Sequence, residues 1–264
     1  MDGNQVMKKI NLLLIGSQKS GTTSLHDCLS KHTKIYMSAP LKEPLFFFPI
    51  ERIKKYFDQR GIKVNSKQDL VKRLMMRDFK NQIYFGESST TYTIGQTTYK
   101  YELPKKVFEY NSNMKILYII RNPFSRIVSH YKHLAKKGRI ADWDFYLDSK
   151  FLWDESIYTS MYYYNLNQWV QYFDLSSIHV MFFEDFVKQT QQCLEDLWCF
   201  LEINNEMIDC QSQNVSLDRS NLYFNEECYD KIFALIQEDC SKLSNLIGID
   251  VFEKWSFEKE LWVH

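Results

Sequence analysis

The chain has 264 residues, of which 45% are hydrophobic and 16% aromatic, and its formal net charge is zero. This composition excludes an intrinsically disordered chain and supplies enough apolar residues for a sizeable core. Zero net charge excludes the global positive field that attracts nucleic acids or anionic membranes, so we expect neither as a partner. The apolar runs are too short to cross a membrane and no secretory leader is recognisable, so we expect one cytoplasmic domain over residues 1–264.

Short apolar runs alternate with helical patterns along most of the chain. The runs are continuous, as is typical of buried parallel strands, and cover Ile10–Ile15, Ile35–Met37, Ile83–Phe85, Ile116–Ile120 and Ile178–Phe183. The helical patterns cover Thr22–Lys31, Lys67–Met76, Tyr99–Tyr110, Phe124–Lys137, Tyr158–Phe173, Phe186–Leu201 and Glu226–Leu246. Ser66 and Asp185 are expected to be helix N-caps. The alternation predicts an α/β fold with a single doubly wound parallel sheet flanked by helices, and ligands at the carboxyl ends of its strands.

The loop Gly16–Leu25 connects the first predicted strand to the first predicted helix. Its two glycines and the start of the helix leave backbone N–H groups available to an anion. The spacing Gly-x-x-x-x-Gly-Thr-Thr matches a Walker A loop with one change, because Thr22 stands at the usual lysine position and Lys19 lies inside the loop. The loop therefore predicts a phosphate site for a nucleotide whose transferred group is not a γ-phosphoryl group.

A charged pair lies beside an aromatic run in Lys42-Glu43-Pro44 and Phe46–Phe48. Burial of a carboxylate in an apolar pocket raises its proton affinity, which suits Glu43 to general-base work. The alternative is an ordinary surface pair with the phenylalanines in the core. Residues 51–80 carry ten Lys or Arg against four Asp or Glu. They are interpreted either as a solvated helix face or as a mobile lid that attracts an anionic cosubstrate.

The fourth predicted strand ends in Arg121, and Ser129 follows about two helical turns later. Pro123 ends the strand and fits the first turn of the next helix. A guanidinium and a hydroxyl that converge in this way suit a phosphate monoester. The pair therefore predicts a second phosphate contact at the carboxyl end of a strand.

Six cysteines are scattered through the chain without a Cys-x-x-Cys pair or a His/Cys ligand spacing. We interpret them as buried thiols and predict neither a zinc site nor a disulfide framework. They are Cys28, Cys193, Cys199, Cys210, Cys228 and Cys240.

Together the motifs resemble those of sulfotransferases that use 3′-phosphoadenosine 5′-phosphosulfate (PAPS). Gly16–Leu25 resembles the 5′-phosphosulfate loop of that family, and Arg121–Ser129 resembles its 3′-phosphate motif. Lys42-Glu43-Pro44 is similar to the branch that acts on heparan sulfate and to bacterial relatives. Further similar segments follow in the family's order, at Gly86–Tyr92, Trp169–Phe173, Phe183–Phe186 and Lys254-Trp255. The resemblance covers nearly the whole chain and implies a P-loop-like fold.

The resemblance implies PAPS as cosubstrate, adenosine 3′,5′-bisphosphate as product and no metal ion. Lys19 would stabilise charge on the departing phosphate, and Glu43 would take the proton from an acceptor hydroxyl or amine during in-line attack on sulfur. Arg121 and Ser129 would hold the 3′-phosphate, and Arg219 would close over it. The 5′-phosphosulfate would be bound by Lys19, Ser20, Gly21, Thr22, Thr23 and Ser24.

The acceptor side is less specific. Lys42, Phe46 and Glu87 are the expected acceptor contacts, and Glu87 is the second candidate for the base. The heparan-type pattern often has a histidine where this chain has Leu45, which weakens the case for a polysaccharide. We expect instead a small secondary metabolite, such as an alkaloid, in a bacterium. Rings for its pocket are offered by Phe46–Phe48, Trp143–Tyr146 and Tyr162–Tyr164.

Three alternatives stay open at this point. The first is a carbohydrate or polysaccharide acceptor, to which the basic residues 51–80 could contribute. The second and third are a P-loop nucleotide kinase and an inactive nucleotide-binding protein. Thr22 and Arg121 speak against the kinase, which would need a lysine and a metal-binding acid at those places. The oligomeric state is also open, with a homodimer as one option.

Overall fold

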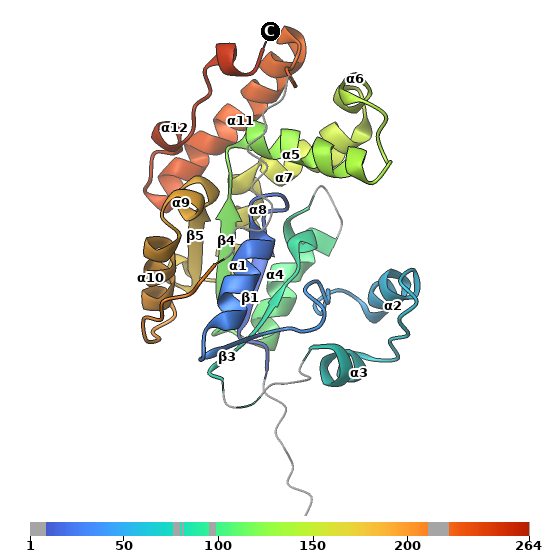
Figure 1. The fold of residues 1–264 in the computed structure, drawn as a ribbon, viewed down its shortest axis with the longest axis vertical. Helices are drawn as coiled ribbons and strands as arrows, with labels where there is room; N and C mark the ends of the chain where they lie inside the picture. Colours follow the sequence, from blue (N-terminus) through green and yellow to red (C-terminus); the bar gives the residue numbers. More distant parts are fainter. Residues whose placement is uncertain (1–8, 76–79, 81, 95–98, 211–221, 264) are drawn as a thin grey trace, which may run out of the picture.

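The computed structural model describes residues 9–75, 80, 82–94, 99–210 and 222–263 (Figure 1). These residues form a five-stranded sheet in the order β2-β3-β1-β4-β5, and every neighbouring pair of strands is parallel. This confirms the predicted single parallel sheet. The strands are β1 (Leu12–Gly16), β2 (Ile35–Met37), β3 (Tyr84–Ser88), β4 (Lys115–Ile120) and β5 (Ile178–Phe182).

The predicted helices are present, but the one over Lys67–Met76 is α-helical only to Leu70 and continues as a π-helix to Met75. The sequence did not predict the shorter α-helices Ile50–Asp58, Trp143–Leu147 and Val251–Lys254. The single helix predicted over Tyr158–Phe173 is interrupted at Met161, whose ψ of 85° is not helical, and the one over Phe186–Leu201 begins earlier and is interrupted at Gln189. The helices are α1 (Thr22–Lys31), α2 (Ile50–Asp58), α3 (Lys67–Leu70), α4 (Tyr99–Tyr110), α5 (Pro123–Lys136), α6 (Trp143–Leu147), α7 (Tyr158–Ser160), α8 (Tyr162–Val170), α9 (Phe183–Lys188), α10 (Thr190–Phe200), α11 (Glu226–Ile247) and α12 (Val251–Lys254).

Short turns of other helix types complete the connections. Within the described ranges, two are π-helical, η1 (Val71–Met75) and η3 (Phe151–Ile157), and three are 3₁₀ turns. Those three are η2 (Thr90–Thr93), η4 (Leu175–Ser177) and η5 (Lys259–Leu261). Of these, η2 matters most for the site, because it directly follows β3 at the carboxyl edge of the sheet.

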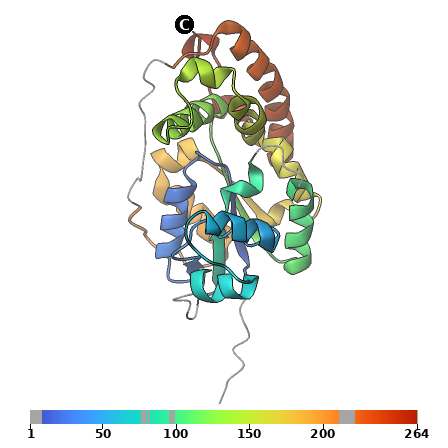
Figure 2. The ribbon, with the colours of Figure 1, turned by 90° about the vertical axis from the view of Figure 1, so that its right-hand side faces the viewer.

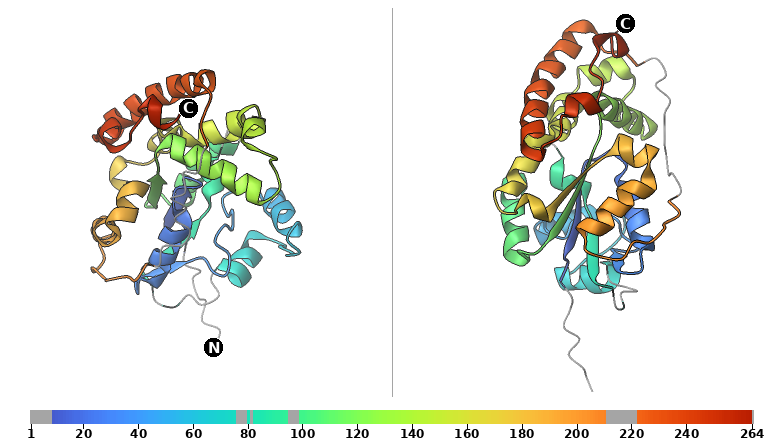
Figure 3. Two further views of the ribbon diagram at one scale, coloured as in Figure 1. Left: turned by 45° about the horizontal axis from the view of Figure 1, so that its top comes forward. Right: turned by 90° about the vertical axis from the view of Figure 1, so that its left-hand side faces the viewer.

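Alternate residues of β1 face two separate cores. Leu13 and Ile15 belong to the larger core, which includes residues of α4, α8 and α11, whereas Leu12 and Leu14 belong to the smaller core with α1 and α10. Figure 2 shows α1 (blue) on one side of the sheet and α4 (green) on the other. The right-hand view of Figure 3 shows α10 on the same side as α1, and α8 on the side of α4. Burial on both faces explains why the residues of β1 before Gly16 are continuously apolar.

The two predicted N-caps have different outcomes. Ser66 caps α3, and its hydroxyl accepts a hydrogen bond from the Asp69 amide at 3.1 Å. The prediction for Asp185 is wrong, because α9 begins directly after β5 and Asp185 lies in its first turn. The Asp185 carboxylate instead pairs with Lys254 Nζ at 2.9 Å. A strand that runs straight into a helix leaves no turn in which a polar cap could precede the apolar residues.

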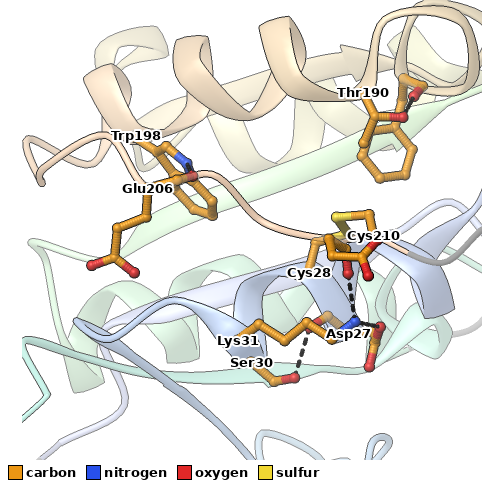
Figure 4. The surroundings of a disulfide bond; sticks show 10 residues. Asp27, Cys28, Ser30, Lys31, Thr190, Trp198, Glu206 and Cys210 are labelled. Carbon is orange, nitrogen blue, oxygen red and sulfur yellow. Dashed lines mark hydrogen bonds and ion pairs between the residues drawn. A yellow bond between two sulfur atoms is a disulfide. The ribbon is translucent and has the colours of Figure 1, made fainter.

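The prediction that the cysteines are buried thiols without a disulfide is wrong for three of them. Cys28 in α1 is bonded to Cys210, 182 residues later in the sequence, and Cys199 is exposed. Figure 4 shows the segment that carries Glu206 and Cys210 beside α1, where Lys31 Nζ also donates to the Asp209 carbonyl at 2.8 Å. The pairing depends on this tertiary contact, which no local cysteine spacing could reveal.

Candidate active site

A cavity of about 470 Å³ lies where β1 and β4 end. It brings together three motifs that are far apart in the sequence: the loop after β1, the charged pair after β2 and the segment after β4. Most of the predicted site residues line it. They are Lys19, Gly21, Thr22, Thr23, Ser24, Lys42, Glu43, Arg121 and Ser129.

The loop after β1 enters α1 through a glycine in the left-handed conformation. Gly21 has a φ of 87°, and a Cβ atom there would lie 2.7 Å from the ring of Phe183, so only glycine fits. Gly21 is the N-cap of α1 and has no side chain that could cap this helix end. The first N–H groups of α1 therefore point toward the cavity without a capping side chain, as in helix termini that bind phosphate.

Lys19 lies among cations. The pKa of Lys19 is lowered, and burial is the largest cause. The positive charges of Arg121, Lys137, Arg126 and Lys42 lower the pKa further. The Lys19 backbone is in the left-handed region with a φ of 70°. A buried cation surrounded by other cations is stabilised when an anion occupies the space between them.

Arg121 is fixed from both sides. Its Nη1 atom donates to the Lys19 carbonyl at 3.2 Å, and its guanidinium lies over the Phe183 ring, 4.6 Å from the ring centre. The Tyr162 hydroxyl donates to the Arg121 carbonyl at 2.6 Å. Ser129 lines the same cavity from α5. The predicted 3′-phosphate pair is therefore adjacent to the Lys19 loop.

Arg126 is a loop-supporting residue that sequence reasoning did not single out. It is fully buried, and its guanidinium donates to the Gln18 carbonyl at 3.3 Å and to Ser160 Oγ at 2.6 Å. It also donates to the carbonyl and hydroxyl of Ser156. The one available signal was a second arginine within the motif that begins at Arg121. Through the Gln18 carbonyl, Arg126 supports the backbone of the loop after β1.

Glu43 is connected to the first turn of α1 through the side chains of Lys42 and Thr22. Its Oε1 atom accepts a hydrogen bond from Thr90 Oγ1 at 2.9 Å and lies 3.7 Å from Lys42 Nζ. Lys42 Nζ in turn donates to Thr22 Oγ1 at 3.4 Å. Burial lowers the pKa of Lys42, and the Glu43 charge opposes that shift. Sequence reasoning did not assign Thr90 to the site, although it lies in the segment Gly86–Tyr92 that resembles the family.

Three predicted site residues that the structure describes do not line the cavity. Ser20 is a fully buried residue of the loop, and Phe46 packs in the core against Tyr110, with 5.6 Å between ring centres. Glu87 is also fully buried, and Arg219 lies outside the described residues. The aromatic runs Phe46–Phe48, Trp143–Tyr146 and Tyr162–Tyr164 are likewise not part of the cavity lining.

The lining is strongly cationic, although the chain as a whole is neutral. Among the described residues, six lysines and arginines line the cavity and Glu43 is its one carboxylate. Three of these cations, Arg60, Lys137 and Arg139, were not predicted as site residues, although Arg60 belongs to the basic stretch 51–80. Local clustering of like charge in a cleft attracts anionic ligands. The described residues contain no group of three or more His, Cys, Asp or Glu placed to hold a metal ion, and metal-free chemistry stays a prediction.

The family model of the sulfotransferase domain matches residues 9–232. The chain belongs to this family. Heparan sulfate glucosamine 3-O-sulfotransferase 5 from human is 26% identical over 179 residues, and the mouse protein of that name is 25% identical. Each alignment covers 64% of this chain and 46% of the relative, so the chain spans about half the length of the curated relatives that it matches. The resemblance found in the sequence is confirmed.

Solved sulfotransferase structures share the fold. The crystal structure of a sulfotransferase from Alicyclobacillus acidocaldarius superimposes with a TM-score of 0.72 at 21% identity, over 92% of this chain and 97% of that one. A sulfotransferase domain from the curacin biosynthetic pathway has a TM-score of 0.57 at 18% identity, with 90% and 98% coverage. A mouse sulfotransferase complexed with PAP has a TM-score of 0.57 at 16% identity, with 91% and 89% coverage.

Proposed function

We propose that this protein is a PAPS-dependent sulfotransferase that modifies a hydroxyl or amine. The observation that carries the proposal is the convergence of Lys19, Arg121 and Glu43 on one cationic cavity beside the uncapped start of α1. An uncapped helix end and a cluster of cations fit a ligand with two separated anionic groups. The family to which the chain belongs and its PAP-bound structural relative support PAPS as that ligand.

The residues of the chain divide the chemistry between them. When bound, PAPS supplies a sulfuryl group that is activated by its bond to phosphate. Glu43, with one oxygen fixed by Thr90, accepts the proton that the acceptor loses as it attacks sulfur in line. Lys19 and the α1 amides stabilise the negative charge that develops on the departing phosphate. Arg121 and Ser129 bind the 3′-phosphate and thereby set the position of the nucleotide.

For the acceptor, we propose a small secondary metabolite. The structural relative from the curacin biosynthetic pathway supports this class, and the cavity volume is in the range of small-molecule sites. The excess of cations and the absence of the three aromatic runs from the described lining disfavour the cationic alkaloid that the sequence led us to expect. A neutral or anionic metabolite avoids that like-charge repulsion. Bacterial origin stays a prediction.

A carbohydrate acceptor is the alternative, because the curated relatives are named for heparan sulfate glucosamine. Arg60 and Arg139 in the lining are suited to sulfate or carboxylate groups on a sugar. The two classes differ in a direct assay. Purified protein is incubated with PAPS and a panel of both acceptor classes, and mass spectrometry detects addition of SO₃.

A binding experiment separates the proposal from its rivals of other classes. Adenosine 3′,5′-bisphosphate without magnesium should raise the melting temperature, and Mg-ATP should not. Stabilisation by Mg-ATP alone would favour a nucleotide kinase. Stabilisation by the bisphosphate without sulfate transfer to any acceptor of a broad panel would favour an inactive nucleotide-binding protein.

No helix within the described residues has both the length and the apolar character needed to cross a bilayer. The cytoplasmic location stays a prediction, and the Cys28–Cys210 disulfide is of a kind that is rare in reducing compartments. The absence of nucleic acid and membrane partners also stays a prediction, and a homodimer stays one option for the oligomeric state. The idea that residues 51–80 form a lid stays a hypothesis. The described part of this stretch contains α2 and α3, which lie at one side of the sheet (Figure 1).

A further inference from the structure

Glu87 is a fully buried carboxylate that lies outside the cavity lining. It belongs to β3, and both of its oxygens accept hydrogen bonds from hydroxyl groups. Tyr92 donates to Oε1, and Ser89 donates to Oε2 at 2.7 Å. A carboxylate in this setting is satisfied without water, as a buried polar group must be.

Each of these two hydroxyls is also an acceptor. Ser89 Oγ accepts from the Leu45 amide at 3.1 Å, and Tyr92 Oη accepts from the Phe47 amide at 3.2 Å. A hydroxyl has one proton to donate, so a hydroxyl that donates to Glu87 presents its lone pairs to the amide. Glu87 therefore sets the direction of two hydrogen-bond chains that end on the backbone of residues 45–47.

The backbone at the end of these chains carries the proposed base. Glu43 lies two residues before Leu45, and Leu45 has a φ of 58°, in the left-handed region. A residue with a side chain keeps that conformation only where the surroundings fix it. The Glu43 carboxylate itself accepts from Thr90, which is next to Ser89 in the chain. One short segment after β3 thus fixes both the loop backbone and the carboxylate.

We propose that Glu87 is a positioning residue that places Glu43 by anchoring residues 45–47 through Ser89 and Tyr92. This inference rests on the proposed function for the role of Glu43, and it replaces the expectation that Glu87 contacts the acceptor or acts as the base. Burial raises the pKa of Glu87 to about 7, and the hydrogen bonds from Tyr92 and Ser89 oppose the shift. The two hydroxyls therefore favour the charged acceptor form on which the arrangement depends.

Hydrogen exchange tests the anchor without any assay of activity. In Tyr92→Phe the amide of Phe47 should exchange about tenfold faster, because a hydrogen bond of ~1–1.5 kcal/mol is lost. In Glu87→Gln the amides of both Leu45 and Phe47 should exchange faster, because both of their acceptors are anchored on Glu87. The peptide that covers residues 17–23 should be unchanged. Tyr84→Phe is the matched control, since the buried Tyr84 hydroxyl donates to the Leu201 carbonyl at 2.8 Å and not to this loop. Unchanged exchange at residues 45–47 in both variants would overturn the proposal.

Kinetics then test the link to Glu43. With an acceptor from the screen, Glu87→Gln and Tyr92→Phe should lower kcat about 10–100-fold, because displacement of a reacting group by about 1 Å has an effect of that size. The KM for PAPS should stay within about twofold, and the double variant should be little worse than Glu87→Gln alone. A loss confined to the KM for PAPS would contradict the positioning role.

Two outcomes separate this inference from the proposed function. If exchange responds as expected while the wild-type protein transfers no sulfate to any acceptor, the anchor stands and the proposed function fails. If wild-type transfer is found and the variants keep wild-type kcat, the inference fails and the proposed function stands. Should Glu87→Gln not fold, Ser89→Ala and Tyr92→Phe carry both measurements, with Ser88→Ala, whose hydroxyl contacts His26, as control.

Discussion

The Arg121 guanidinium donates a hydrogen bond to the carbonyl of Lys19 at 3.2 Å. These residues are 102 positions apart in the sequence, and they belong to the two motifs assigned to the 3′-phosphate and to the 5′-phosphosulfate. Their contact brings the two predicted phosphate sites to adjacent walls of one cavity. A single nucleotide with phosphate at both positions could therefore occupy both, which gives the proposed function its sharpest tests.

Lys19→Ala should lower kcat at least about a hundredfold, since removal of one transition-state donor costs ~3–4 kcal/mol. Binding of adenosine 3′,5′-bisphosphate should be largely preserved, because the α1 amides and Arg121 remain. Calorimetry and steady-state kinetics measure the two effects separately. The matched control is Lys136→Ala, an exposed lysine of α5 outside the lining. Near-wild-type turnover in Lys19→Ala would remove this lysine from the mechanism.

Glu43→Gln keeps the size of the side chain and removes the proton acceptor. We expect kcat to fall at least about a hundredfold with little change in bisphosphate affinity, as for Glu43→Ala. Glu51→Gln, an exposed glutamate in α2, is the control and should keep wild-type kinetics. If the Glu43 variants retain full turnover, the proton must leave by another route.

Arg121→Ala should weaken binding of adenosine 3′,5′-bisphosphate about 10–100-fold, because a charge-assisted contact with the 3′-phosphate is lost. Adenosine 5′-phosphate lacks that group and should lose much less affinity. Because Arg121 also supports the Lys19 carbonyl, Ser129→Ala provides a second variant with a smaller loss of the same selectivity. Equal losses for both nucleotides in isothermal titration calorimetry would contradict the assignment.

The elevated pKa of Glu87 predicts a pH dependence of stability. Burial raises this pKa from 4.5 to about 7, so between these values the native state binds a proton that the unfolded chain releases. The stabilisation is complete below pH 4.5 and is lost as the pH rises through about 7. Glu87→Gln removes this titration. As the pH rises from 5 to 8, the melting temperature of the wild type should therefore fall relative to that of Glu87→Gln. Parallel melting-temperature profiles for the two proteins would argue against the raised pKa.

Loss of the Cys28–Cys210 disulfide should destabilise the protein by ~2–4 kcal/mol, since the bond closes a long loop. Urea denaturation of Cys28→Ser, compared with wild type under oxidising conditions, measures the effect. Cys199→Ser, which replaces an exposed free cysteine, should have wild-type stability. If reducing agent leaves the wild-type midpoint unchanged, the bond does not contribute to the fold in solution.

Local sequence patterns determined the architecture and the principal motifs. Continuous apolar runs predicted β2 with its observed bounds and the other strands to within a few residues, because strands buried on both faces need no polar residues. The loop around Lys19 and the Arg121–Ser129 segment were recognisable as motifs because their residues lie close together in the chain, and their roles as phosphate sites stay predictions. The family resemblance that they carried is the one that the comparisons confirm.

Only the tertiary structure decided which other residues support the site. Thr90 contacts Glu43 from 47 residues away, Arg126 reaches the Gln18 carbonyl across 108 residues, and Cys28 pairs with Cys210. A threonine, an arginine or a cysteine at such a position has no distinctive local pattern, because its role depends on contacts between distant segments. Glu87 shows the same limit, since its burial was decided by how β3 packs and not by its neighbours in the sequence.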